Sequence, residues 1–359
     1  MKKIRQQFPA LKQGIYCNTA TSGLLSNDLM LWRQAHDNEF LMGGSQMKMY
    51  SNTQHSETRK TVGAFFSCAS DNVALVPSFT IGLNFLLEGL NKNEKVLLLN
   101  GDYPSLNWPF ESRGFDIYYV PISDSSEAQL YNEIKSKNIT VLALSLVQWL
   151  NGFMIDLEFF KKLKNDFPDL MIIADGTQFC GSRKFNFDDS GIDILGASAY
   201  KWLLAGYGNG FILVNEDVKP RFTMVSKGYG SGRNIPEHNQ RRTFCKHLEP
   251  GHLDSLNFGS LKFSLDFLSK IGMDRVEQQN ALLSKNAKES FGQLGLLEDE
   301  ITQRNQHSTI FNIAGDDQLY EKLAQKNVIC AQRGGGIRLS FHFYNLIAEI
   351  EEILNIVKS

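Results

Sequence analysis

The sequence lacks several features that would assign it to a class at once. The longest apolar runs, 95–99 and 140–147, are too short to cross a bilayer. No apolar region follows the charged residues at the start, so we expect no secretory signal. The net charge of −2 provides no basic excess for nucleic acid and no polybasic segment for a membrane surface. We therefore expect neither nucleic acid nor a membrane as a partner.

Cysteine is scarce and scattered. The five cysteines are odd in number and no two form a C-x-x-C pair, so we expect reduced thiols in a cytoplasmic protein. Among the seven histidines there is no H-E-x-x-H, and His247 and His252 are five positions apart, which does not fit one helix face. We expect no metal site.

The sequence does contain an alternation of short apolar runs with amphipathic stretches. We expect strands at 73–76, 95–99, 116–120, 140–147, 170–174, 192–197 and 210–214, and helices at 81–90, 105–113, 127–137 and 157–167. Strands that alternate with helices imply βαβ crossovers, which predicts an α/β fold with a mainly parallel sheet.

The pattern changes after about residue 250. We expect helices at 255–271, 273–294, 316–327 and 345–357, a strand at 308–313 and a short strand pair across the glycines at 334–336. These elements predict a smaller α+β domain. The resulting division is an N-terminal segment (1–15), a large domain (16–250) and a small C-terminal domain (251–359).

Chemically useful side chains follow several of the predicted strands. Asp175, Lys201 and Tyr103 each come after a strand, and residues 78–80 (SFT) lead from a strand into a helix. Ligands of open α/β sheets bind beyond the carboxyl ends of the strands. A lysine for an aldehyde, an acid for a ring nitrogen, a helix start for a phosphate and an aromatic for stacking are what pyridoxal 5′-phosphate (PLP) requires. Taken singly, each residue also fits a cap, a turn or the core.

Four segments carry a resemblance to a known family. Residues 174–178 (ADGTQ) and 198–201 (SAYK) match its D-x-x-Q and S-x-x-K motifs, with Lys201 26 positions after Asp175. Residues 16–21 (YCNTAT) are similar to its opening motif, and 335–345 (GGIRLSFHFYN) to its G-x-x-R-x-S-x-x-x-Y-N segment. Over nearly its whole length the chain resembles the class V aminotransferases of fold-type I PLP-dependent enzymes. Cysteine desulfurases, kynureninases and isopenicillin-N-epimerase-like proteins belong to this family.

The resemblance implies a fold and a set of roles. The fold is a mainly parallel seven-stranded sheet between helices, with a smaller C-terminal α+β domain. Lys201 is the Schiff-base lysine and proton shuttle, and Asp175 the partner of the pyridinium nitrogen. The other implied cofactor contacts are Ser78, Phe79 (through its N–H), Thr80, Tyr103, Gln148, Gln178, Ser198, Tyr200 and His252. Arg338 is assigned to the substrate carboxylate, with Asn18 beside the substrate.

The sequence departs from the family pattern at four of these positions. Ser78 and Phe79 replace a glycine and a threonine of the phosphate-binding turn, and Asn18 replaces an acid. His252 stands where many relatives have a threonine that reaches the neighbouring subunit's phosphate site. The family implies a homodimer with active sites at the interface, to which Tyr229, Arg233 and His252 are candidate contributors.

The motifs leave the reaction open. We expect an aminotransferase acting on a small amino acid, with cysteine desulfurase or another C–S or Cβ lyase, epimerisation, and a non-catalytic PLP-fold binding protein as alternatives. Cys330, eight residues before Arg338, is a candidate desulfurase nucleophile, but its surroundings predict a buried structural thiol. The glycine-rich runs 206–210 and 228–232 lack the context of a dinucleotide site and predict loops.

Overall fold

A computed structural model describes residues 2–231 and 240–359. Its main sheet has seven strands in the order β2-β8-β7-β6-β5-β3-β4. These strands are β2 (Val73–Val76), β3 (Lys95–Asn100), β4 (Asp116–Pro121), β5 (Val141–Ser145), β6 (Met171–Asp175), β7 (Ile194–Ser198) and β8 (Gly210–Val214). Six of these strands run in the same direction and β8 runs opposite to them, so the predicted mainly parallel sheet is confirmed.

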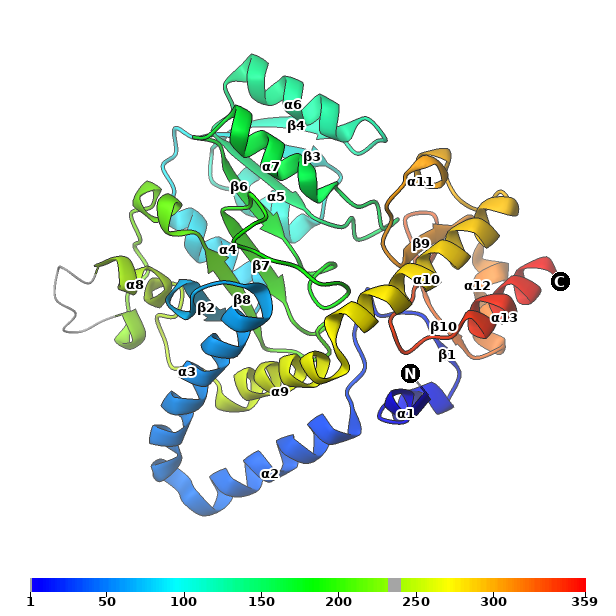
Figure 1. Cartoon of the computed structure of the whole chain (residues 1–359), viewed down its shortest axis with the longest axis horizontal. Coiled ribbons are helices and arrows are strands. Elements are labelled where there is room, and N and C mark those ends of the chain that lie inside the picture. Colours follow the sequence, from blue (N-terminus) through cyan, green and yellow to red (C-terminus); the bar gives the residue numbers. More distant parts are fainter. Residues whose placement is uncertain (1, 232–239) are drawn as a thin grey trace.

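Helices cover both faces of this sheet (Figure 1). Alternate residues of each central strand enter two separate apolar clusters, as a doubly covered sheet requires. One cluster includes α4 (Phe79–Glu88), α5 (Pro104–Glu111) and α8 (Gln240–His247). The other includes α3 (Met47–Phe66), α6 (Ser126–Lys137), α7 (Leu157–Asp166) and α9 (Ser255–Ile271).

The C-terminal elements gather around a smaller sheet at the other end of the molecule (Figure 1). This sheet has the order β11-β12-β9. Its strands are β9 (Ile310–Ile313), β11 (Ala331–Arg333) and β12 (Gly336–Ser340), and the helices here are α10 (Met273–Gln293), α11 (Asp299–Gln303), α12 (Asp317–Gln325) and α13 (Ile347–Lys358). A third apolar cluster lies here. Where the two predicted domains divide stays a prediction.

The N-terminal residues join this C-terminal end. After α1 (Lys2–Arg5), β1 (Ile15–Tyr16) pairs in parallel with β10 (Val328–Ile329). The chain then passes toward the main sheet and enters α2 (Asn27–Gly43), which leads into α3. Residues 17–23 therefore run between the two ends of the molecule.

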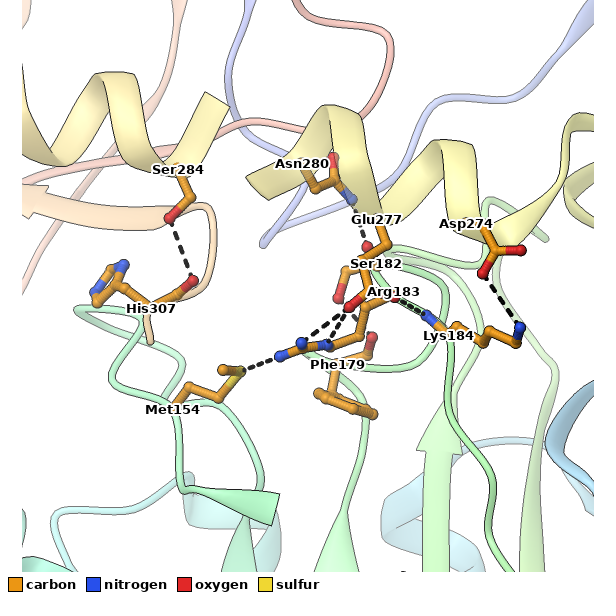
Figure 2. Close-up of polar contacts among 10 residues, drawn as sticks. All are labelled: Met154, Phe179, Ser182, Arg183, Lys184, Asp274, Glu277, Asn280, Ser284 and His307. Carbon is orange, nitrogen blue, oxygen red and sulfur yellow. Dashed lines mark hydrogen bonds and ion pairs between the residues drawn. The ribbon is translucent and has the colours of Figure 1, made fainter. Parts of the chain in front are cut away.

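Polar contacts hold α10 against the loop that follows β6 (Figure 2). Arg183 donates from Nε and Nη2 to Glu277 Oε1, at 3.2 and 2.9 Å, and from Nη1 to Met154 Sδ. Asn280 Nδ2 donates to the Ser182 carbonyl at 2.6 Å. These contacts connect the C-terminal elements to the segment that carries residues 175–178.

No helix in the described parts of the chain is both long and apolar enough to cross a membrane. Within the same residues, no three His, Cys, Asp or Glu side chains group as metal ligands. All five cysteines are buried and free.

Candidate active site

The candidate residues meet at one edge of the main sheet. Strands β6 and β7 end at Asp175 and Ser198, and β2 ends beside them. The β2 direction matches that of β7, because both are antiparallel to β8. The turns after these strands therefore open at the same edge, which is where the sequence predicts them.

Lys201 lies on the turn that follows β7. Its side chain is buried, with Nζ 5.4 Å from the Tyr103 ring centroid and 5.5 Å from that of Tyr200. Among the described residues it forms no ion pair within 4.0 Å, although the charge of Asp175 raises its pKa. The pKa of Lys201 is lowered to about 8, chiefly because burial penalises the ammonium form; the charge of Asp175 opposes this, and the charges of Arg338 and Arg333 act with burial. About a tenth of this amine is therefore neutral at pH 7.

Asp175 is the matching buried acid. Its Oδ1 accepts a hydrogen bond from Thr177 N at 2.8 Å. Burial raises the pKa of this carboxyl to about 6, while the bonds from Thr177 and the charge of Lys201 act in the opposite direction. A second buried acid, Asp102, accepts from the backbone N–H groups of Tyr103 at 2.6 Å and Ser145 at 2.8 Å. Asp102 thereby ties the loop of Tyr103 to the end of β5.

Arg338, on β12, is a buried guanidinium that forms no ion pair among the described residues. Nη1 donates to the Trp149 carbonyl at 2.7 Å and Nη2 to Thr21 Oγ1 at 2.6 Å, whereas Nε is buried without a partner. Burial lowers the pKa of Arg338 to about 10. A buried cation without an anion is costly, so this arrangement favours an anionic ligand.

The start of α4 has its own internal bonds. Ser78 Oγ caps the helix by accepting from Ile81 N at 3.3 Å, and Phe79 N donates to Ser198 Oγ at 2.9 Å. Phe79 packs against Gly196, where a Cβ would come within 2.6 Å of the ring. The absence of that side chain brings the helix start close to β7. Thr80 is half-buried beside this turn.

Gln178 and Gln148 differ in how many hydrogen bonds the protein makes to their side-chain amides. Gln178 donates from Nε2 to the Ala20 carbonyl at 3.0 Å and accepts from Trp202 Nε1 at 2.7 Å, which leaves one N–H of its amide. Gln148 Nε2 is buried and has no hydrogen-bond partner among the described residues. Within the same residues, Asn18 Oδ1 is also buried without a partner, next to the bridge between Asn18 and Ser340 of β12.

Comparison with protein families decides which family this arrangement represents. The model of the family described as Aminotransferase class-V matches residues 34–353, which is most of the chain. The chain is a class-V aminotransferase family member.

Curated relatives of this family member are distant in sequence. It is 24% identical to an uncharacterized aminotransferase of Schizosaccharomyces pombe, over 84% of this chain and 81% of the relative. It is also 24% identical to a cysteine desulfurase of Plasmodium falciparum, over 79% of this chain and 57% of that protein.

Solved structures extend the likeness of the class-V member to the whole fold. Two structures of C-DES superpose with TM-scores of 0.86 and 0.85 at 17% identity, covering 98% and 97% of this chain and 98% of each C-DES chain. One is a lysine-to-alanine mutant with glycine covalently linked to the PLP cofactor. The other is described as a cystine C-S lyase in complex with its product cysteine persulfide. At this identity the likeness shows the fold, and the predicted fold class is confirmed.

The class-V family uses PLP, so PLP is the cofactor that membership assigns to this chain. The residues present fit it. A partly neutral lysine lies near a buried acid that it does not contact, and three buried polar atoms of Gln148, Asn18 and Arg338 lack partners at the same edge. Lys201 would hold the aldehyde, Asp175 the ring nitrogen, and the start of α4 the phosphate.

His252 is the candidate cofactor residue that the structure does not bring to this edge. It is exposed, and its ring lies 5.2 Å from that of Tyr229. Together they line a surface pocket with residues of α2 and α3, among them His36 and Lys48. A role in the neighbouring subunit's site stays a prediction. Arg233 lies outside the described residues.

Residues that sequence reasoning did not assign also build the site. Trp149 and Thr21 hold Arg338, and Asp102 holds Tyr103. Asp102 follows a predicted strand, which is a signal that could have identified it. The sequence gives no signal for the contact of the Trp149 carbonyl with Arg338, because this contact depends on how β12 meets the loop after β5.

Proposed function

We propose that this chain is a PLP-dependent aminotransferase that takes the amino group from a small α-amino acid. The observation that carries the proposal is the buried guanidinium of Arg338, which forms no ion pair with the described residues and lies close enough to Lys201 to lower the pKa of the lysine. Arg338 would bind a carboxylate while Lys201 would act at the Cα next to it, which matches the structure of an α-amino acid.

The chain's own residues divide the work. Arg338 binds the substrate carboxylate, and the contacts of its Nη atoms with Trp149 and Thr21 keep Nε available. When bound, the cofactor supplies an electron sink for the bond that breaks at the substrate Cα. Lys201 Nζ would take the proton from the substrate Cα and hold it for return, a role that its pKa of about 8 suits. Tyr103 covers one side of Lys201.

The cysteines weigh against desulfuration through a protein thiol. Cys330 is buried between β10 and β11, and burial raises the pKa of its thiol to about 11. A desulfurase nucleophile has to be an accessible thiolate on a mobile loop. Cleavage of a substrate C–S bond, the activity that the description of C-DES as a cystine C-S lyase gives for that enzyme, is a separate outcome that the experiment must distinguish.

The test is spectroscopic. Purified protein loaded with PLP is mixed with each amino acid in turn and the visible band of the bound aldehyde is followed. Transamination predicts loss of this band with release of a 2-oxo acid, and its recovery when a 2-oxo acid is added. Release of sulfide or persulfide from cysteine or cystine would select a lyase instead. Lys201→Ala should abolish turnover, whereas Cys330→Ala should keep it.

We also propose a homodimer with active sites at the interface. In support, α2 and α3 expose a group of large apolar side chains that no described residue covers, and His252 lies beside them. The division at about residue 250 and a cytoplasmic location are proposals as well. The five unpaired, buried thiols are consistent with a reducing compartment.

A further inference from the structure

A tight hairpin fixes the position of Arg333 next to the candidate site. In the antiparallel pair β11 and β12, Arg333 lies opposite Gly336, and Ala331 lies opposite Arg338. The two-residue turn consists of Gly334 and Gly335, with φ of 59° and 75°. Positive φ at both central residues is the requirement of a type I′ turn, which sets the register of the strands.

This register places Arg333 and Arg338 on one face of the small sheet. Cross-strand partners share a face, and so do residues two apart along a strand. Arg333 therefore shares its face with Gly336 and Arg338, whereas Ile337 and Leu339 point into the apolar cluster on the other side.

Two contacts hold the hairpin beside the residues that surround Arg338. Asn312 on β9 pairs with Arg338 of β12, and its Nδ2 donates to the Arg333 carbonyl at 3.2 Å. A Cβ at Gly334 would come within 2.5 Å of Leu150 Cδ2, so the turn lies directly against Leu150. Leu150 follows Trp149, the residue whose carbonyl holds Arg338.

The charge of Arg333 has no counter-ion in the part of the chain that the structure describes. Its guanidinium is exposed and, within residues 2–231 and 240–359, forms no hydrogen bond or ion pair. Its positive charge lowers the pKa of both Arg338 and Lys201, which means that it acts on the site and not only on solvent. Two guanidinium groups thus lie on one face of the small sheet near Lys201, with Arg338 buried and Arg333 exposed.

We infer that Arg333 binds a second anionic group at the far end of the substrate side chain, so that the substrates are α-amino acids with acidic side chains. This inference rests on the proposed function, because it takes Arg338 as the partner of the α-carboxylate. Arginine presents a planar pair of donors that matches carboxylate and phosphate oxygens. A neutral side chain would leave this guanidinium unpaired.

The experiment compares donors in the PLP-loaded protein and in Arg333→Gln. The donors are aspartate, glutamate and O-phosphoserine, each against a neutral amino acid of similar size (asparagine, glutamine and serine). The readout is kcat/KM for loss of the aldehyde band. We expect at least a tenfold preference for one acidic donor, and at least a tenfold fall of that preference ratio in Arg333→Gln. Arg275→Gln, which removes an exposed arginine on α10, should leave the ratio unchanged.

A binding measurement gives a second readout that does not depend on turnover. Calorimetric titration with unreactive dicarboxylates, succinate and glutarate, should show affinity at least tenfold higher than with butyrate, and Arg333→Gln should remove this difference. Equal loss for acidic and neutral donors in the variant, or no acidic preference in the wild type, would overturn the inference. Conversion of neutral amino acids alone would overturn the inference but leave the proposed function intact. No response to any amino acid would refute the proposed function itself.

Discussion

At the residue scale, the ionisation of Lys201 reflects a balance between burial and three charged neighbours. Burial, Arg338 and Arg333 favour the neutral amine, and Asp175 favours the ammonium. An ordinary lysine has a pKa near 10.4, so only a very small fraction of such side chains is neutral at pH 7. A pKa of about 8 raises the neutral fraction of Lys201 by more than a hundredfold.

This balance predicts opposite effects of two substitutions. In the protein without PLP, trace acylation of amines followed by peptide mass spectrometry should give a midpoint near pH 8 for Lys201. Asp175→Asn removes the charge that stabilises the ammonium, so the midpoint should fall. Arg338→Gln removes a repelling charge, so it should rise. A midpoint above pH 10, or shifts of the same sign in both variants, would contradict the electrostatic description.

The sequence predicts the chemical groups of the site better than the contacts that position them. The sequence identifies Asp175 and Lys201 because both come shortly after predicted strands of a parallel sheet, and Arg338 because it falls in a segment that resembles a family motif. The buried contacts from Thr21 and Trp149 to Arg338 bring together positions more than 180 residues apart, which local pattern cannot reveal. Arg333 was not singled out, since its relation to the site depends on the register of a hairpin.

At the element scale, the strands and crossover helices of the main sheet lie where their apolar periodicity predicts them. Helices α2 and α3 did not emerge from the same reasoning. Their large apolar residues are not confined to a buried face, and several remain exposed. Apolar residues reveal a helix in the sequence when they recur on the one face that is buried. A helix with apolar side chains on exposed faces as well does not show this pattern.

The exposed surface of α2 and α3 predicts where two copies of the chain meet. Leu41 is 79% exposed, Met42 86% and Met49 81%, at the corner where α2 turns into α3, at the lower left of Figure 1. Light scattering on a sizing column should give a mass twice the 40.6 kDa of the chain. The double variant Leu41→Glu and Met42→Glu should weaken the dimer at least tenfold, because it places charge in an apolar contact.

Leu282 provides the control for this experiment. It is 49% exposed on α10, away from the α2 and α3 corner, so Leu282→Glu should remain dimeric. A wild-type monomer at micromolar concentration, or a double variant with unaltered mass, would rule out this surface as the interface.

At the scale of the whole molecule, the candidate site draws on both ends of the fold. The main sheet contributes Lys201 and Asp175, the small sheet contributes Arg338, and the segment that joins them contributes Asn18 and Thr21. Two kinds of contact hold these parts together: the polar contact of Arg183 with Glu277 (Figure 2), and the packing of Ile310 and Tyr344 into the apolar cluster of the main sheet. The sequence predicted both sheets, but not the contacts between the ends.

The most direct measurement of the central claim is chemical reduction of the PLP-loaded protein followed by peptide mapping. Borohydride should fix the cofactor as a stable secondary amine on Lys201, with no adduct on that peptide in Lys201→Ala. Asp175→Asn should still accept the cofactor but lose at least a hundredfold in turnover. An adduct on another lysine, or none on Lys201 in protein that has bound PLP, would contradict the account.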